Sequence, residues 1–156
     1  MKTFNIFNEE LEKIGKSLGS NEGGKYKESD DNSIYSRFYD HKNEDIRTIV
    51  ASKTKDPVLL HKMAKDERNH TPSILYSIIG NENTHINTLD YIAKNVLGAG
   101  YHTEIVNNPN THLVTLHHIL KSTNSLYLAN KISSHKNADD NLKSLVIEKY
   151  KSLNHY

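Results

Sequence analysis

The residues best suited to chemistry in this sequence are histidines that recur at a fixed spacing. His85 and His112 lie 27 residues apart, inside the segments NENTHINTLDYIAK (81–94) and NPNTHLVTLHHILK (108–121), which agree at 8 of 14 positions. Imidazole nitrogens are common zinc ligands, so a shared metal site is one interpretation. Two nitrogens on one zinc lie roughly 3 to 4 Å apart, however, whereas stacked helices lie about 8 to 10 Å apart. We therefore expect each histidine to stand at a helix start, with no metal between them.

His112, His117 and His118 form a second cluster, with the spacing H-x-x-x-x-H-H. Ligands on one helix face follow i, i+3 or i, i+4, and neither i+5 nor i+6 keeps the rings together. The sequence contains no cysteine, no glycine-rich phosphate loop after a strand and no nucleophile elbow. It therefore predicts a protein that is not an enzyme and has neither metal nor cofactor.

These histidines belong to a longer repeating pattern. Apolar pairs of the form Leu-x-x-Ile recur at spacings of 29, 27 and 26 residues, as Leu60/Met63, Leu89/Ile92, Leu116/Ile119 and Leu142/Leu145. Nine to eleven residues earlier stand the pairs Ile49/Val50, Ile78/Ile79, Ile105/Val106 and the weaker Lys131/Ile132. Each unit is thus predicted to be a short helix A, a turn and a short helix B. Four repeats result, over about residues 43–69, 71–97, 101–122 and 124–147.

Capping residues mark the expected helix starts. Asp56 precedes Pro57 in the favourable order of an N-cap followed by a proline at the first helical position. Thr84, Thr111 and Asn137 are expected at or beside the corresponding cap positions. Helices of about 8 to 11 residues are marginal alone, so they must stack on their neighbours. We therefore expect an all-α fold, in which about four two-helix repeats build a short α-solenoid.

The first 33 residues do not share the repeat. An N-terminal amphipathic helix is predicted within residues 1–18 by apolar residues at helical intervals, namely Phe7, Leu11, Ile14 and Leu18. Residues 19–33 are rich in glycine and charge, which is typical of a flexible linker. The repeat domain is expected over residues 34–156, with Ile34–Lys42 and the tail rich in tyrosine and lysine as its caps.

The first unit, DIRTIVASKTKDPVLLHKMAKD (45–66), resembles the repeat of the leucine-rich repeat variant family, which is similar to helical repeats of the HEAT type. The match is carried by Asp45, Ile46, Arg47, Val50, Ala51, Pro57, Leu60, Met63, Ala64 and Asp66. The third unit matches again at Ile105, Val106, Asn108, Pro109, Thr111, Leu116 and Ile119. The resemblance spans about residues 45–146 and implies a right-handed superhelix of alternating short helices. One type of member carries an iron–sulfur cluster, which a chain without cysteine could not bind.

Composition narrows the class of function. The 156 residues carry a formal net charge of +1, so the molecule lacks the strong positive field of proteins that bind nucleic acid mainly through phosphates. The first residues lack the apolar core of a secretory signal, and no run approaches the ~20 apolar residues of a membrane span. A cytoplasmic protein without membrane contact is expected. Its richness in Asn and Lys suggests an AT-rich coding genome, as in many low-GC bacteria and their phages.

Equivalent positions of stacked helices project in the same direction, so the residues after each repeated leucine should line one face of the B helices. These candidate partner-binding residues are His61, Lys62, Asp90, Tyr91, His117, His118 and Lys143. An ordinary solvated surface is an equal alternative. Between residues 69 and 136 only 7 of 68 residues are Asp, Glu, Lys or Arg, while 7 are His, which favours an adaptable contact surface. We expect a non-enzymatic protein-binding module, of the size and form of an inhibitor or an immunity or counter-defence protein.

A lysine column offers a rival function. Lys65, Lys94 and Lys121 end successive B helices, where the simpler interpretation is that they complement the helix dipoles. They could also follow a phosphate backbone, together with Arg47 and Lys131, in a nucleic-acid-binding solenoid. A third alternative is a histidine-driven pH switch, which predicts loss of helicity or of partner binding at about pH 6. Neither the partner nor the oligomeric state is predicted.

Overall fold

The computed structural model describes Glu9, residues 35–96 and residues 98–153. Apart from Glu9, the expected N-terminal helix (1–18) and linker (19–33) therefore lie outside the described residues. Within the described ranges the regular elements are helices, and no strand occurs among them. The expectation of an all-α fold is confirmed for this part of the chain. None of its helices combines the length and the apolarity that crossing a lipid bilayer requires.

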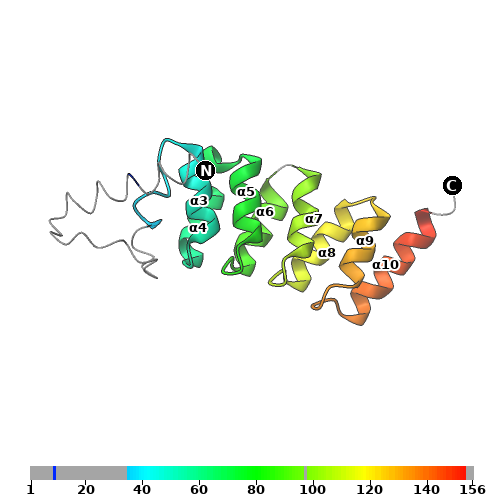
Figure 1. The fold of residues 1–156 in the computed structure, drawn as a ribbon. Helices are drawn as coiled ribbons and strands as arrows, with labels where there is room; N and C mark the ends of the chain where they lie inside the picture. The colour runs from blue at the N-terminus through cyan, green and yellow to red at the C-terminus, as the bar shows by residue number, and fades with distance from the viewer. Residues whose placement is uncertain (1–8, 10–34, 97, 154–156) are drawn as a thin grey trace.

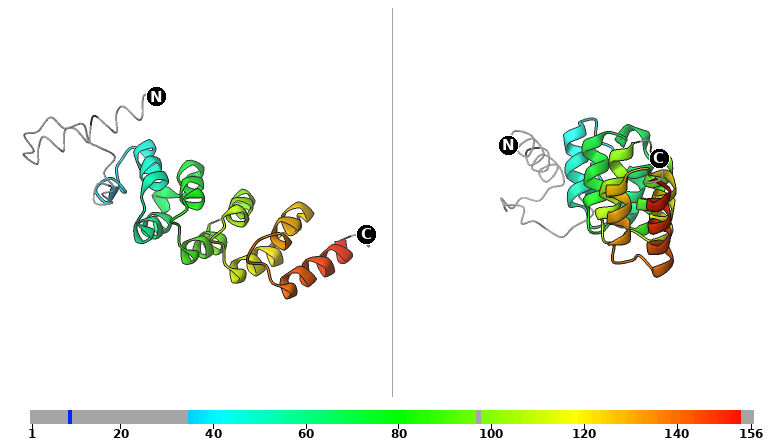
Figure 2. Two further views of the ribbon diagram at one scale, coloured as in Figure 1. Left: turned by 60° about the horizontal axis from the view of Figure 1, so that its bottom comes forward. Right: turned by 90° about the vertical axis from the view of Figure 1, so that its right-hand side faces the viewer.

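The helices alternate between two rows. Row A contains α3 (Glu44–Lys53), α5 (Pro72–Gly80), α7 (Ala99–Asn107) and α9 (Leu126–Ser133). Row B contains α4 (Pro57–Lys65), α6 (Ile86–Asn95), α8 (Leu113–Ser122) and α10 (Asp140–Leu153), and the short 3-10 helix η1 (Glu67–Asn69) follows α4. Each row-A helix packs on the next one in its row, as α4 does on α6 and α6 on α8, while α10 packs on α9 (Figure 1, Figure 2).

The repeated leucines all lie in the core. Leu60, Leu89, Leu116 and Leu142 are each 0% exposed. The row-B helices begin at residues 57, 86, 113 and 140, at spacings of 29, 27 and 27. The first three leucines are therefore the fourth residues of their helices, whereas Leu142 is the third residue of α10. The predicted spacing of 26 for the last unit is one residue too short when it is measured from the helix starts.

Asparagine side chains join each A–B turn to the preceding turn and maintain the spacing of 27. The amide of Asn110 donates to the carbonyls of Glu82 and Thr84, at 2.8 and 3.3 Å. The amide of Asn137, 27 residues later, donates to the carbonyl of Thr111 at 2.9 Å. Because these bonds recur with the turn, they set the start of α10 independently of the leucine pattern.

Two buried asparagines also join successive A–B turns through side-chain hydrogen bonds. The amide of Asn81 donates to the carbonyls of Ala51 and Thr54, both at 2.9 Å, and the amide of Asn108 donates to the carbonyl of Ile79. Both asparagines are buried. Their amides satisfy carbonyls at the ends of row-A helices, where no further helical turn supplies a donor. Side-chain hydrogen bonds therefore supplement the apolar core in a chain that is only 35% hydrophobic.

Two threonines that stand beside row-B helix starts bind carbonyl groups at the ends of row-A helices. Thr84 Oγ1 donates to the carbonyl of Ile78 at 2.5 Å, and Thr111 Oγ1 donates to that of Ile105. Both threonines are 0% exposed, and each stands immediately before the N-cap residue of a row-B helix. Asp56 caps α4 as expected, since its carboxylate accepts a backbone N–H at 2.8 Å.

The two ends of the helix rows differ. At the first end Phe38 is 4% exposed, and Tyr35 and Tyr39 pack against the core, which fits the expected cap over Ile34–Lys42. At the other end α10 presents Ile147, which is 55% exposed. One end is therefore closed by aromatic side chains, while the other leaves apolar surface in contact with solvent.

Candidate functional site

The outward side of row B carries three of the seven candidate partner-binding residues and all three lysines of the lysine column. The second, sixth and ninth residues of a helix lie on one face, because they are spaced at i, i+4 and i+7. In α4, α6 and α8 the second residues are Val58, Asn87 and Val114, the sixth are Lys62, Tyr91 and His118, and the ninth are Lys65, Lys94 and Lys121. We term these nine residues the row-B face. Tyr91 and His118 are half-buried and the other seven are exposed.

The fifth residues of the row-B helices lie between helices rather than on an open ridge. His61 Nδ1 is 3.1 Å from Thr88 Oγ1, which places the contact between α4 and α6. Asp90 Oδ1 accepts a hydrogen bond from Thr115 Oγ1 at 3.0 Å, between α6 and α8. Both threonines are buried. His61 and Asp90 therefore help to position the row-B face, and each keeps only part of its surface for contact with a partner.

The last two residues of the predicted column differ from each other. His117 is the fifth residue of α8 and is half-buried, like His61 and Asp90. Lys143 is the fourth residue of α10, and Ser144 takes the fifth position. The prediction that Lys143 continues the column is therefore wrong by one residue, because Leu142 is the third residue of its helix and not the fourth. Lys143 instead lines a groove between α9 and α10.

Tyrosine rings hold two lysines of the row-B face. Lys62 Nζ lies 4.2 Å from the ring centroid of Tyr39, and Lys65 Nζ lies 5.9 Å from that of Tyr91. The ring of His61 meets Tyr91 edge-on, with centroids 6.0 Å apart. Cations over aromatic faces gain a modest electrostatic attraction at exposed sites. The two ammonium groups are thus positioned at the surface without a carboxylate to neutralise them in these contacts.

The lysine column is partly neutralised. Lys94 Nζ lies 2.7 Å from Oδ2 of Asp90, whose other oxygen already accepts from Thr115. In α10 the ninth residue is Glu148, so the column ends at an acid. A chain of phosphates would therefore meet two unpaired lysines rather than a continuous series of cations, which weakens the electrostatic case for nucleic acid.

Arg47 and Lys131 do not extend that column. Arg47 is only 9% exposed, and its guanidinium donates to Asn69 Oδ1 at 2.8 Å and to the carbonyl of His41 at 2.6 Å. Lys131 belongs to α9 in row A, where its Nζ donates to Asn107 Oδ1 at 2.8 Å. The expectation that Arg47 contacts phosphate is therefore wrong, because burial and these hydrogen bonds keep its charge inside the first end of the rows.

His85 and His112 are the N-caps of α6 and α8. His85 Nδ1 accepts from the backbone N–H of Asn87 at 3.2 Å, and His112 Nδ1 accepts from that of Val114 at 3.4 Å. Each ring thus satisfies an amide that has no partner within its helix. Within residues 35–96 and 98–153, no cluster of three or more His, Cys, Asp or Glu side chains is placed to hold a metal ion.

Three exposed aliphatic residues were missed by the sequence analysis. Val58 and Val114 are 74% and 57% exposed, and Ile86, the first residue of α6, is 36% exposed. We term these three residues the aliphatic line, because each lies in the first turn of a row-B helix. A signal was present, since each valine stands two residues before a buried leucine and so about 200° away from it around the helix. The row-B face is therefore apolar where its helices begin and basic where they end.

A hollow of about 670 Å³ opens where α6 and α8 end and α7 and α9 begin. Lys94 and His118 of the row-B face line it, together with the apolar side chains of Val96 and Leu128. Because Lys94 is already paired with Asp90, this hollow suits a side chain that combines carbon surface with a polar group. The structure thus brings two predicted residues to one concave site.

Three ionisable groups with perturbed pKa values, Asp66, Arg68 and Tyr101, lie away from the row-B face. The side chain of Arg68, at 2.5 Å, lowers the pKa of Asp66, the residue that caps the end of α4. Burial raises the pKa of Tyr101, and the neighbouring Tyr76 adds to the shift. A pKa that differs between the folded and the unfolded protein makes stability depend on pH.

Comparisons with known proteins add no evidence about the function of this chain. No protein-family model, no curated protein and no solved structure matches the chain. The resemblance to leucine-rich repeat variant repeats therefore rests on the residues quoted for it.

Proposed function

We propose that this chain is a non-enzymatic protein-binding module, and that its row-B face receives an acidic segment of a partner that also presents apolar side chains. The observation that carries the proposal is the pairing of an apolar edge with a basic edge on one face. The aliphatic line exposes Val58 to 74% and Val114 to 57%, which a partner would cover. The lysines at the other edge would orient an acidic segment and speed its association.

The centre of the face supplies the anchors of this interaction. Tyr91 and His118 lie between the two edges at equivalent positions of α6 and α8. Aromatic residues at the centre of an interface contribute most when the surrounding contacts exclude water, and tyrosine is enriched at such positions. A module without catalytic groups would act by covering its partner's surface, in the manner of an inhibitor or of an immunity or counter-defence protein.

We also propose that the two helix rows are a right-handed α-solenoid of the leucine-rich repeat variant or HEAT-like type. This is supported by contacts that recur between successive helices of each row and by asparagine bonds that recur after 27 residues. In such arrays stability comes from interfaces between neighbouring repeats. The outward residues are then free to serve recognition, because few of them are needed for the core.

The rival proposal is nucleic-acid binding through the lysine column, with Lys65 and Lys121 as its contacts to phosphate. Its support is the shared ninth position of Lys65, Lys94 and Lys121. The ion pair of Lys94 with Asp90 and the acid at the next position reduce that support. Retention on generic duplex DNA at low salt, lost at physiological salt, is the behaviour that this rival requires.

The test is a quantitative pull-down from the source organism with the full chain as bait. The face variant Val58→Glu/Val114→Glu changes two exposed side chains, and Tyr127→Glu on α9, 63% exposed in the wild type, is the matched control. We expect one or more proteins to be retained by the wild type and the control and lost from the face variant. Equal retention by all three chains would refute the row-B face, and retention of duplex DNA alone would favour the rival.

A further inference from the structure

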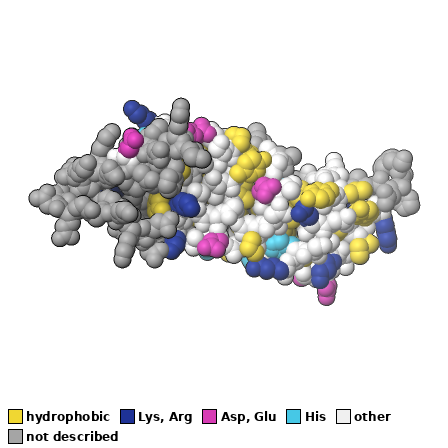
Figure 3. All heavy atoms as spheres, in the orientation of Figure 1, with side chains coloured by type: hydrophobic (Ala, Val, Ile, Leu, Met, Phe, Trp, Pro, Cys, Tyr) yellow, Lys and Arg dark blue, Asp and Glu magenta, His cyan; other side chains and the backbone are white. Residues whose placement is uncertain are grey.

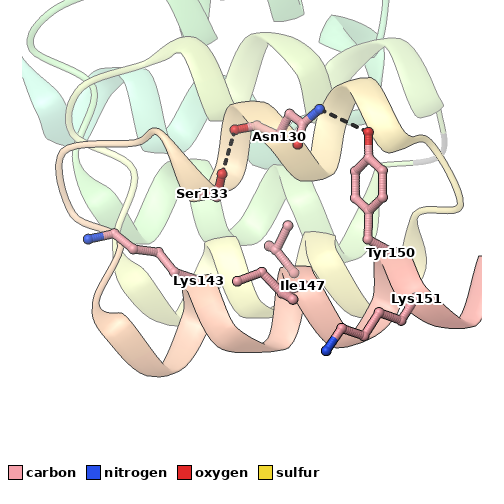
Figure 4. Close-up of a pocket in the computed structure, with 7 residues that line it drawn as sticks. Asn130, Ser133, Lys143, Ile147, Tyr150 and Lys151 are labelled. Carbon is pink, nitrogen blue, oxygen red and sulfur yellow. Dashed lines mark hydrogen bonds between the residues drawn. The ribbon is translucent and has the colours of Figure 1, made fainter.

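The last helix pair leaves an open groove of about 490 Å³ between α9 and α10. Its lining residues are Asn130, Ser133, Lys143, Val146, Ile147, Tyr150 and Lys151. Figure 4 shows Asn130 and Ser133 of α9 facing Ile147 and Tyr150 of α10 across the groove. The amide of Asn130 donates to the Tyr150 hydroxyl at 3.2 Å, which links the two helices at one end of the groove.

Ile147 occupies a position that is buried in every earlier row-B helix. It is the eighth residue of α10 and corresponds to Ala64, Ala93 and Leu120 in α4, α6 and α8. Those three residues are 0%, 5% and 4% exposed, whereas Ile147 is 55% exposed. In α4, α6 and α8 a following helix pair covers the position, and no following pair occurs among the described residues. The groove is therefore the site where one further helix would complete the packing.

The groove is basic as well as apolar. Two of its seven lining residues are lysines and none of those seven is an acid. Lys143 Nζ has Asp140 at 3.4 Å, but that carboxylate is fully exposed and outside the lining. Figure 3 shows lysine and apolar side chains gathered over the α9–α10 end of the molecule. The matching ligand is an amphipathic helix with acidic residues beside its apolar stripe.

Residues 7–18 of this chain have that pattern. Phe7, Leu11, Ile14 and Leu18 recur at i, i+4, i+7 and i+11, which predicts one apolar stripe. Glu10 borders this stripe, and the three acids Glu9, Glu10 and Glu12 outnumber the two lysines Lys13 and Lys16, so the segment is net acidic. Twelve residues make a helix about 18 Å long, which is longer than the row-A helices of 8 to 10 residues and shorter than the 14-residue α10. The segment therefore fits the groove in length, apolar pattern and charge.

We propose that the α9–α10 groove of one molecule binds residues 7–18 of a second copy. The segment 19–34 connects residues 7–18 to Tyr35, which packs at the first end of the rows. A linker of 16 residues with the flexibility that the composition of residues 19–33 predicts has an end-to-end distance of roughly 20 to 24 Å. Three row-A steps of about 8 to 10 Å each separate α3 from α9, so a molecule reaches its own groove only with a stretched connection. A second copy binds without that cost, in a head-to-tail contact that can propagate.

Sedimentation velocity of the full chain over about a hundredfold range of concentration tests this contact. We expect the average mass to rise with concentration in the wild type and to stay monomeric in Ile147→Glu, because the new carboxylate repels the acidic segment and loses the apolar contact. Leu11→Glu, on the other side of the contact, should also be monomeric. Tyr127→Glu is the control, since Tyr127 is 63% exposed on α9 and does not line the groove, and it should associate like the wild type.

A labelled peptide of residues 5–20 provides the second measurement. It should bind the full-length Leu11→Glu chain, whose grooves are vacant in this account, and binding to Leu11→Glu/Ile147→Glu should be at least about tenfold weaker. A wild type that stays monomeric over the whole range overturns the proposal, because residues 7–18 then do not join two copies. Association that persists in Ile147→Glu overturns it equally. Loss of association in the face variant Val58→Glu/Val114→Glu alone would assign the contact to the row-B face instead.

Discussion

The hydroxyl of Thr115 donates a 3.0 Å hydrogen bond to Oδ1 of Asp90, while Lys94 holds Oδ2 of the same carboxylate at 2.7 Å. One side chain thus joins α6 to α8 and also neutralises a lysine of the row-B face. His61 and Thr88 make the equivalent contact between α4 and α6. The surface proposed for binding and the interface between repeats are therefore built from neighbouring positions of the same helices.

A double-mutant cycle measures this contact. Thr115→Val should lower the free energy of unfolding by about 0.5 to 1.5 kcal/mol in the wild type, because a hydrogen bond to a charged acceptor is lost. In the Asp90→Ala background the same substitution should cost much less. Urea unfolding of the four proteins gives the coupling energy. Additivity within about 0.3 kcal/mol would mean that the two side chains contribute independently.

Asn81→Ala should be among the most damaging polar substitutions. It removes both hydrogen bonds to the carbonyls of Ala51 and Thr54 and leaves those groups without their side-chain donor in a buried turn. We expect a loss of about 2 to 3 kcal/mol in the free energy of unfolding, measured with urea. Asn124→Ala, at an exposed position, is the control and should change it by less than about 0.5 kcal/mol. Similar losses in the two variants would contradict the role of the Asn81 hydrogen bonds in joining successive turns.

His85→Asp should stabilise the protein at neutral pH. An aspartate keeps an acceptor at the N-cap, as Asp56 does in α4, and adds a negative charge at the positive end of the helix dipole, for a gain of about 0.3 to 1 kcal/mol. His85→Ala removes the acceptor and should cost about 1 kcal/mol. Thermal unfolding of the three proteins decides the order. If the His85→Ala variant were as stable as the wild type, the 3.2 Å hydrogen bond from the backbone N–H of Asn87 would contribute nothing to the free energy of unfolding.

Stability should depend on pH through Asp66. Arg68 lowers the pKa of this carboxyl in the folded state, so its ionised form favours folding. The contribution is complete above the unfolded value of about 3.9 and is lost as the pH falls through the lower folded value. Urea midpoints measured between about pH 2.5 and 6 should fall with acid less steeply in Asp66→Asn than in the wild type. Parallel curves for the two proteins would assign the acid sensitivity to other groups.

The sequence predicts the helix pairs well where the signal lies in residues of a single helix. Asp56 and Pro57 mark a helix start through adjacent residues, and Leu60, Leu89 and Leu116 recur at the same depth in their helices because the apolar stripe must face the neighbouring helix. The sequence misplaces Lys143 because α10 begins 27 residues after α8 while Leu142 follows Leu116 by 26, and the bond from Asn137 to the carbonyl of Thr111 follows the spacing of 27. Such a bond between turns leaves no periodic signal in the apolar residues.

The candidate face could be predicted only in part. Lys62, Tyr91 and His118 share a face because residues at equivalent helix positions project alike. The roles of His61 and Asp90 depend on the distance and rotation of the next helix, which brings Thr88 and Thr115 within hydrogen-bond reach. The sequence suggests that Arg47 is an exposed cation. In the structure its guanidinium donates to the carbonyl of His41 and to the side chain of Asn69. These contacts arise from packing between elements, which local spacing does not encode.

Hydrogen–deuterium exchange of the full chain, alone and with the protein that its pull-down retains, tests the binding face most directly. We expect the partner to slow exchange in α4, α6 and α8, above all in the first turns that carry Val58, Ile86 and Val114. The row-A helices α5 and α7 should change little. Protection confined to row A, with unchanged exchange in α4, α6 and α8, would contradict the assignment of partner binding to row B.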